Sequence, residues 1–290
     1  MKLLLDSINY NDELELAKQI QINNENYTGD VTFHCFWHGI LSEKHLISIR
    51  SCYCFNVHNK KNRKIILWVE QNKVNEINEE IKKFAEIREF DYKKEISTTI
   101  FNDKKFDFKT KLSYYADLVR YILLLKYGGI WFDLDILFFR NIDPILINYS
   151  NSICVYRWEK ENYPNNAFYI SLNKNNPDMI NNINFLINRN LGWGFQAHAT
   201  EDNLTYDTNM SLLVLPCSWF DPSWIDNPYS FKHDQFFKPT SKIWTFDTFF
   251  PGAFCFHWHN QWDEDIAKTS VCRQLDNIII NKFSELWEVN

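Results

Sequence analysis

Hydrophobic residues in the first half of the chain fall into short apolar runs that alternate with segments of helical spacing. The run Val31–Trp37 (VTFHCFW) is β-branched and aromatic, which predicts a strand. Ser42 predicts the start of a helix that continues to about Val57, and residues 64–70 (KIILWVE) predict a second buried strand. Residues 74–84 repeat apolar side chains at the spacing of a helix face. Strands separated by helices in this way predict a parallel sheet with right-handed crossovers, which binds ligands at the carboxyl ends of its strands.

The next helical segment ends at a pair of glycines. Residues 111–127 carry an apolar stripe with helical spacing and are followed by Gly128 and Gly129, which predicts a helix with a sharp end. On this helix Asp117 and Arg120 are three residues apart, so their side chains share a face that lies away from most of the apolar residues. The spacing is typical of a surface ion pair, and it also suits a pair in a binding site.

Two acids follow inside an apolar run. Residues 130–139 (IWFDLDILFF) are too short and too aromatic for a helix and predict a core strand, with Trp131, Asp133 and Asp135 on one face. Two carboxylates in an apolar layer need a cation beside them, such as arginine, lysine or a divalent metal. Oxygen ligands suit Mg²⁺ or Mn²⁺, which would itself hold a substrate phosphate. The alternative is that the strand ends near Asp133 and that both acids are exposed.

Composition and charge exclude several classes of protein. The 31 Lys and Arg against 37 Asp and Glu give a net charge of -6, so the chain has no overall attraction for nucleic acid, and the basic run at residues 60–64 predicts a solvated loop. No apolar stretch approaches the roughly 18 residues of a membrane span, and the N-terminus lacks the apolar region of a signal peptide. Seven cysteines without a C-x-x-C pair suit reduced, buried thiols. We therefore expect a cytoplasmic protein. Abundant Asn, Lys and Ile indicate an AT-rich coding genome, such as that of a large DNA virus, a bacterium or a protist.

The middle of the chain resembles the DXD region of the sugar-binding glycosyltransferases of family 32. The matching residues are the helical motif A-D-x-x-R-Y-x-x-L that begins at Ala116, the Gly-Gly stop, and Asp133-x-Asp135. A lone D-x-D occurs by chance in many chains, whereas these three motifs in fixed register are specific. The segment is also similar to that of the large clostridial glucosylating toxins. The resemblance implies a GT-A fold, a nucleotide-sugar donor that is usually UDP-linked, and transfer with retention of anomeric configuration.

Two further motifs extend the resemblance to both ends of the chain. Residues 34–39 (HCFWHG) are similar to the family's first strand, which implies that Trp37 stacks on the nucleotide base; without the motif, Trp37 would be a core residue at a strand end. Residues 257–262 (HWHNQW) resemble the family's closing motif. This match implies that His257 and Asn260 complete the metal shell and that Trp262 lies over the diphosphate.

The remaining site roles also follow from the resemblance. Asp135, with Asp133 in support, would hold Mn²⁺ or Mg²⁺. Asp117 and Arg120 would bind the hydroxyls of the donor sugar, and Trp131 would form a wall of the sugar site. The expected catalytic residues are thus the three acids and Arg120. The Gly-Pro acceptor motif of family 32 is not found, and residues 198–203 stand where it would be, so acceptor recognition is not carried over.

We expect one GT-A domain over residues 1–290, with a Rossmann-like, mostly parallel sheet flanked by helices and an irregular C-terminal half. Residues 1–140 would form the nucleotide-sugar-binding half, and residues 141–290 the acceptor-side and metal-completing half. The expected function is metal-dependent, retaining transfer of a hexose from a UDP-sugar or another nucleotide sugar to a glycan, lipid or protein acceptor.

Two alternatives remain open. One is a non-catalytic protein that binds a sugar nucleotide. The other is a haloacid-dehalogenase-type phosphatase, whose first strand also ends in D-x-D but is followed by a Gly-Thr turn. In this chain the apolar residues 136–138 follow instead.

Overall fold

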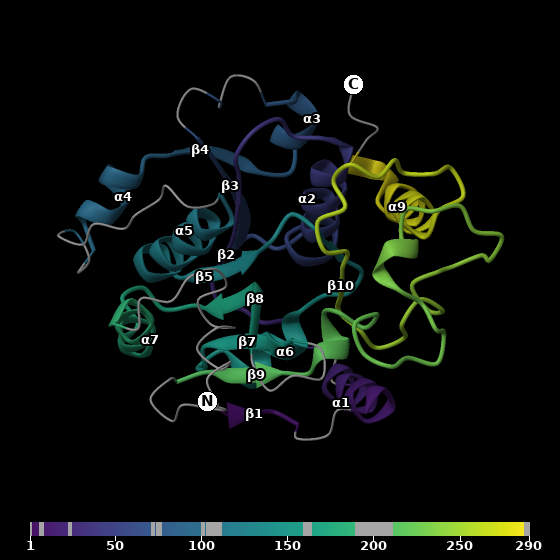
Figure 1. Ribbon diagram of the computed structural model, residues 1–290, viewed down its shortest axis with the longest axis horizontal. Coiled ribbons are helices and arrows are strands. Elements are labelled where there is room, and N and C mark those ends of the chain that lie inside the picture. Colours follow the sequence, from purple (N-terminus) through teal and green to yellow (C-terminus); the bar gives the residue numbers. More distant parts are fainter. Residues whose placement is uncertain are drawn as a thin grey trace.

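A mostly parallel sheet forms the centre of the molecule (Figure 1). The computed structural model describes residues 2–5, 9–22, 25–70, 73, 77–99, 102, 112–158, 164–188 and 211–286. Within them, eight strands pair in the order β1-β9-β7-β8-β5-β2-β3-β4. Their bounds are Lys2–Leu3 (β1), Val31–Trp37 (β2), Arg63–Glu70 (β3), Glu86–Phe90 (β4), Gly129–Phe132 (β5), Cys154–Arg157 (β7), Pro164–Ser171 (β8) and Leu213–Leu215 (β9). All neighbouring pairs are parallel except the two that β8 makes with β5 and β7. The expected α/β class with a mostly parallel sheet is confirmed.

Helices cover both faces of this sheet, so the molecule has three layers (Figure 1). One face packs against Tyr92–Ser97 (α4), Leu112–Tyr127 (α5) and Pro177–Asn188 (α7), and the other against Tyr10–Gln21 (α1), Glu43–Asn56 (α2) and Asp143–Tyr149 (α6). The helices Glu79–Lys82 (α3) and Val271–Lys282 (α9) lie beside α2. No helix in the described part of the chain is long and apolar enough to cross a bilayer.

The C-terminal part is irregular, as expected. After β9, the described residues 211–286 contain Cys255–His257 (β10), α9 and three short 3-10 helices. These segments enclose a separate apolar cluster rich in Phe and Trp, which packs against the outer side of α2. The core is therefore continued beyond the sheet by aromatic side chains.

Two predictions from the first half need correction. Among the described residues of the predicted helix 74–84, only those of α3 are helical. This helix begins at Glu79, because the Asn78 side chain accepts a hydrogen bond from the Glu80 N–H and caps it. The edge strand β4 was not predicted. Its sequence EIREF mixes charged and apolar residues, as an exposed edge permits.

The single strand predicted over residues 130–139 is two strands. β5 ends at Phe132, and a turn closed by the hydrogen bond from Ile136 N to Asp133 O leads into Ile136–Phe138 (β6). β6 leaves the main sheet and pairs antiparallel with β10, a segment more than a hundred residues later in the chain. The alternative prediction of a strand end near Asp133 is therefore right about the backbone, and the turn places both acids at the carboxyl end of β5.

The paired glycines bring α5 and β5 close to neighbouring backbone. Gly128 and Gly129 have φ values of 65° and 116°, in the region that favours glycine. A Cβ atom on Gly129 would lie 2.2 Å from the carbonyl oxygen of Thr32 in β2. Glycine at this position therefore lets β5 pair with β2 directly after the helix ends.

Candidate active site

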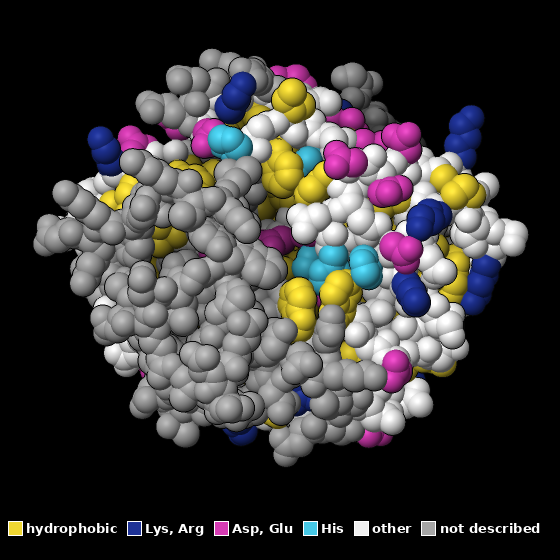
Figure 2. Space-filling view, viewed as in Figure 1, with side chains coloured by type: hydrophobic (Ala, Val, Ile, Leu, Met, Phe, Trp, Pro, Cys, Tyr) yellow, Lys and Arg dark blue, Asp and Glu magenta, His cyan; other side chains and the backbone are white. Residues whose placement is uncertain are grey.

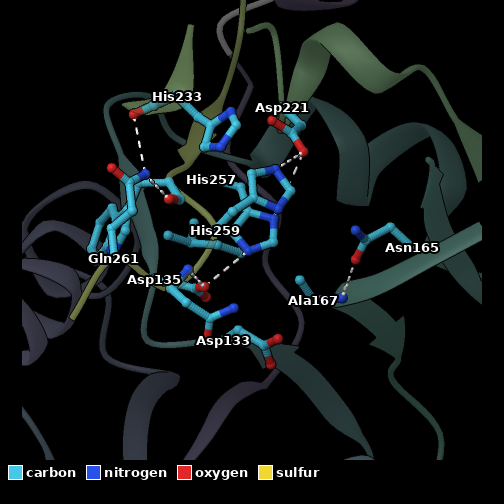
Figure 3. Close-up of polar contacts among 12 residues, drawn as sticks. Asp133, Asp135, Asn165, Ala167, Asp221, His233, His257, His259 and Gln261 are labelled. Atoms are coloured by element: carbon cyan, nitrogen blue, oxygen red, sulfur yellow. Dashed lines mark hydrogen bonds and ion pairs between the residues drawn. The ribbon is translucent and has the colours of Figure 1, made fainter. Parts of the chain in front are cut away.

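Acidic, histidine and hydrophobic side chains gather in the middle of the face shown in Figure 2, and Figure 3 shows Asp133 and Asp135 near each other beside a group of histidines. The side chain of Asp133 is 30% exposed, whereas that of Asp135 is 8% exposed. Asp133 thus opens toward the surface, and Asp135 faces the interior. The alternative that both acids are exposed is therefore wrong for Asp135.

Arg120 on α5 connects two of the predicted acids. Its Nη1 donates to Asp117 Oδ1 at 2.8 Å, and its Nη2 donates to Asp133 Oδ1 at 2.7 Å. The Trp131 Nε1–H donates to the same Asp133 oxygen at 2.5 Å, and the guanidinium lies 5.0 Å from the centre of a Trp131 ring. Asn166 adds a hydrogen bond to Asp117 Oδ1 at 3.2 Å. Because Arg120 is only 2% exposed, the pair with Asp117 is not the surface ion pair that spacing alone suggested.

Burial and charge act in opposite directions on these groups. Burial alone would lower the pKa of Arg120, but the carboxylates of Asp133 and Asp117 raise it, so the guanidinium stays charged. Burial raises the pKa of Asp133, although Arg120 opposes the shift. Burial would also raise the pKa of Asp135, but the His257 imidazole and the Asn260 N–H hold it well below the usual range. Asp135 is therefore an ionised carboxylate inside the protein.

His257 at the end of β10 lies between two carboxylates. Its Nε2 is 3.1 Å from Asp135 Oδ2, while its Nδ1 is 2.8 Å from the Tyr156 hydroxyl and 3.8 Å from Asp221 Oδ2. Burial would lower the pKa of His257, but Asp135 and Asp221 raise it to about 9. The sequence prediction that His257 would lie beside Asp135 therefore agrees with the geometry.

Asp221 and His259 belong to the same cluster and were not predicted. His259 Nε2 is 2.6 Å from Asp221 Oδ2, and the rings of His259 and His257 stack with their centres 3.9 Å apart. Figure 3 shows the two imidazoles between Asp135 and Asp221. The pattern His-x-His at positions 257 and 259 was a signal, since alternate residues of an extended segment share a face. No local pattern marked Asp221.

The chemistry of these groups suits a divalent cation. One ligand atom from each of Asp221, His257 and His259 lies within 4.8 Å of the others, a spacing that permits joint binding of a metal ion. Asp221 Oδ1 is buried and has no hydrogen-bond partner among the described residues, so it is available to a cation or a water molecule. Carboxylate oxygen and imidazole nitrogen are both ligands for Mn²⁺.

Asn260 reaches Asp135 through its main chain. Its N–H donates to Asp135 Oδ2 at 2.7 Å, and its side-chain oxygen accepts a hydrogen bond from Trp262 Nε1 at 3.3 Å. The three successive residues His259, Asn260 and Gln261 have φ values of 51°, 65° and 49°. This left-handed run turns the chain so that the Asn260 N–H faces the acid.

Trp37 and Trp262, at opposite ends of the sequence, lie together. Their ring centres are 4.7 Å apart, and the imidazole of His45 stacks on Trp262 at 4.3 Å with an angle of 6° between the rings. Trp37 is half-buried at the carboxyl end of β2 and packs against the core cluster, so its position fits both the predicted contact with a base and the alternative of a core residue at a strand end. His45 was not predicted because its position depends on this long-range contact. Residues 198–203, where an acceptor motif was sought, lie outside the described residues.

Comparison with known proteins gives one matching family model and several similar structures. Residues 48–152 match the model described as "Glycosyltransferase sugar-binding region containing DXD motif". A search of curated proteins found no match to the chain.

Three of the similar structures are glycosyltransferases of low sequence identity. PaToxG glycosyltransferase is 16% identical, over 71% of this chain and 78% of its own, with a TM-score of 0.36. GlyE of Streptococcus pneumoniae TIGR4 is 12% identical, over 89% of this chain and 64% of its own, with a TM-score of 0.49. Mouse xyloside xylosyltransferase 1 is 11% identical, over 66% of this chain and 86% of its own, with a TM-score of 0.45. No residue role is transferred from them.

The family match covers the segment in which the sequence motifs were found. It includes α5, the paired glycines and both acids of the D-x-D sequence. The narrower resemblance to family 32 and to the clostridial toxins stays a prediction. Residues 48–152 are therefore similar to the glycosyltransferase sugar-binding region that contains a DXD motif.

Proposed function

We propose that the chain is a metal-dependent, retaining glycosyltransferase that moves a hexose from a nucleotide sugar, with a UDP-sugar as the first choice, to a glycan, lipid or protein acceptor. One observation carries this proposal. The buried Arg120 bridges Asp117 and Asp133 at the end of β5, two residues from the contact between Asp135 and His257. Buried carboxylates with fixed partners at a strand end form a site prepared for charged, hydroxyl-bearing ligands.

The cation, Mn²⁺ or Mg²⁺, is assigned to Asp135 and the Nε2 of His257, with Asp133 and Asn260 in support. Among the described residues, the carboxylates of Asp133 and Asp135 lie on this side of His257 and that of Asp221 lies on the other, so the stronger negative charge favours the D-x-D side. Asp221 and Tyr156 at Nδ1 would then orient the imidazole, as outer partners of metal-bound histidines do. When bound, the cation neutralises charge that develops on the leaving diphosphate.

The protein's own residues would bind and orient the donor. Asp133 Oδ1 is held by Arg120 and Trp131, which leaves Oδ2 for a ribose or sugar hydroxyl. The side chains of Asp117 and Arg120 are 9% and 3% exposed, so Arg120 is a positioning residue for Asp133 as much as a contact for the sugar.

The surrounding tryptophans complete the donor site. Trp131 is only 1% exposed, so it would hold Asp133 in place instead of forming the predicted wall of the sugar site. Trp37 would stack on the base, and Trp262 would cover the diphosphate. Transfer with retention would proceed by departure and attack on the same face of the sugar.

The test is release of nucleotide from a panel of UDP- and GDP-sugars without acceptor. We expect cleavage of one donor with Mn²⁺, loss of cleavage in EDTA, and no activity in Asp135→Asn. Asp234→Asn is the matched control, because Asp234 is an exposed acid paired with Lys238, and it should keep full activity. Donor binding without cleavage under any metal would favour the non-catalytic alternative, and phosphate release from simple phosphomonoesters would favour the phosphatase.

Mn²⁺ binding by variants, measured by electron paramagnetic resonance, tests the position of the cation. His257→Ala should abolish binding in either arrangement. His259→Gln should weaken it by about 10- to 100-fold if His259 lies in the outer shell. Complete loss of binding in His259→Gln would instead place the ion among Asp221, His257 and His259.

A further inference from the structure

A second pocket lies at the other end of the sheet from the acids. It has a volume of about 560 Å³ and is formed by the end of α2, the start of β3 and the segment between α3 and β4. Arg63 at its base pairs in register with Val31, the first residue of β2, whereas Trp37 is the last residue of β2. Six residues of extended strand separate the two positions by about 20 Å, so this pocket is distinct from the candidate active site.

Positive charge lines this pocket in an otherwise acidic protein. Six cationic side chains contribute to it: Lys60, Lys61, Arg63, Lys64, Lys82 and Lys83. Their acidic partners are fewer. Asp143 pairs with both Lys60 and Arg63, Glu86 with Lys64, and Glu79 with Lys82. Six cations against three acids leave a surplus of three positive charges.

Two lysines of the rim are free to bind an anion. Lys61 and Lys83 are exposed, and neither has an ion-pair partner in the described part of the chain. Lys82 lies in the last turn of α3, where a cation stabilises the helix, but Lys61 lies outside any helix. Helix stabilisation therefore does not account for the whole cluster.

The base of the pocket is rigid. Arg63 has a fully buried side chain, which pairs with Asp143 and donates to the carbonyl oxygens of Asn56 and Tyr27 at 3.2 and 3.1 Å. Its Nε–H is buried and lacks a hydrogen-bond partner among the described residues. Residues 60–62 form a turn with Lys61 exposed, which agrees with the predicted solvated loop, whereas Arg63 is buried, begins β3 and anchors the pocket.

We propose that this pocket binds a compact anion that carries two or more phosphate groups on a small ring. Lysines recognise phosphate as point charges, and Lys61 and Lys83 lie on separate segments, so two phosphates can be engaged at once. The volume falls within the roughly 300 to 1,000 Å³ of small-molecule sites. Tyr53, Ile65 and Phe84 provide an apolar wall for the body of the ring. The ligand is either free in solution or the headgroup of a lipid.

The first test measures binding of inositol trisphosphate by calorimetry in EDTA, which removes the cation that the candidate active site needs to hold phosphate. The double variant Lys61→Glu/Lys83→Glu should bind at least about tenfold more weakly than the wild type. The matched control Lys18→Glu/Lys238→Glu has the same change in net charge on exposed lysines elsewhere and should bind as the wild type does. Equal binding by wild type and the Lys61/Lys83 variant, or equal loss in both variants, would overturn the proposal.

A second arm identifies the source of the ligand. Phosphatidylcholine vesicles with and without phosphatidylinositol bisphosphate are sedimented with the protein. Binding to the phosphorylated lipid supports a headgroup, and binding to free inositol trisphosphate alone supports a soluble ligand. Binding to neither contradicts the proposal. Donor cleavage should be unchanged in the Lys61/Lys83 variant, which separates this pocket from the proposed transferase activity.

Discussion

Arg120 lies in the interior and pairs with two carboxylates. Its contribution to stability depends on hydrogen bonds to both of them. A guanidinium presents donors in a planar fork, whereas an ammonium is a single point of charge. Removal of one partner from a buried ion pair costs more than the pair contributes, because the remaining charge has no water around it. The same reasoning applies to each buried charge of the site.

Arg120→Lys should therefore lower the free energy of unfolding by about 2 kcal/mol, since one of Asp117 and Asp133 loses its hydrogen bond. Arg88→Lys is the control, because Arg88 pairs with the partly exposed Glu86 on the edge strand, and its free energy of unfolding should change by less than about 0.5 kcal/mol. Urea denaturation at neutral pH measures both. Equal effects in the two variants would contradict the role assigned to burial.

His34 in β2 gives a second prediction at this scale. Its Nδ1 accepts a hydrogen bond from Trp68 Nε1 at 3.0 Å, and its Nε2 lies 3.0 Å from the carbonyl oxygen of Gly128. Both ring nitrogens are satisfied when the imidazole is neutral. Burial lowers the pKa of His34 from 6.5 to about 4. The histidine of the first-strand motif is thus a structural link between β2, β3 and the glycine pair.

Because the folded-state pKa of His34 is lower than the unfolded one, stability is present above about pH 6.5 and is lost as the pH falls toward 4. Between pH 7 and pH 5, the wild type should lose about 2 kcal/mol more unfolding free energy than His34→Asn. Urea denaturation at the two pH values checks this difference. An identical pH dependence in both proteins would show that His34 is charged in the fold.

At the scale of elements, the sequence predicts best those helices and strands that are determined by residues close together in the chain. β2 and α2 have the predicted bounds to within a residue, because alternating apolar residues and the Ser42 cap act over a few positions. The break between β5 and β6 was only the alternative prediction, because the pairing of β6 with the distant β10 leaves no local signal. The apolar alternation survives the break: Phe132, Leu134 and Ile136 share one core cluster, while Trp131 packs in the other.

The candidate site shows the same division. Asp117, Arg120, Asp133, Asp135 and His257 could be chosen from motif register, and the structure brings them together. Asp221 and His45 could not be chosen, because the contacts that place them join segments far apart in the sequence.

The glycine pair gives a prediction for an element junction. Gly129→Ala should destabilise the protein by more than about 2 kcal/mol, because the new Cβ would meet the Thr32 carbonyl oxygen and φ would stay at 116°. Gly39→Ala is the control for strain alone, since φ is 112° there but a Cβ would meet no atom closer than Trp37 Nε1, at 3.8 Å. In thermal unfolding, Gly129→Ala should have a lower Tm than Gly39→Ala. The reverse order would contradict the argument from close approach.

At the scale of the whole molecule, the candidate site unites distant parts of the chain. Asp117 to Asp135 come from the region around α5 and β5, and Asp221 to Trp262 come from the irregular C-terminal part. A ligand held by both sets of residues links their unfolding. The division into a donor-binding half and a metal-completing half stays a prediction.

Mn²⁺ together with the nucleoside diphosphate that is released from the cleaved donor should therefore stabilise the whole protein. Ligand at 100 times its dissociation constant adds about 2.7 kcal/mol, which corresponds to a rise in Tm of about 5 °C or more. Scanning calorimetry should show this rise in the wild type and in Asp234→Asn, and its absence in Asp135→Asn. A rise of the same size in Asp135→Asn would place the ligand elsewhere.

The turn that carries the two acids also joins the main sheet to the pair β6 and β10. Asp135 accepts two main-chain hydrogen bonds at this joint, from Trp258 N to its carbonyl oxygen and from Asn260 N to its carboxylate. Among the described residues, the side chain of Asp133 is held by Arg120 and Trp131, both of which come from the same region of the chain. Loss of the Asp135 carboxylate would therefore loosen the joint between the two sheets, whereas loss of the Asp133 carboxylate would leave Arg120 with Asp117 as its partner inside one region. The second acid of the D-x-D sequence is thus a tie between two distant parts of the fold, and the first acid is not.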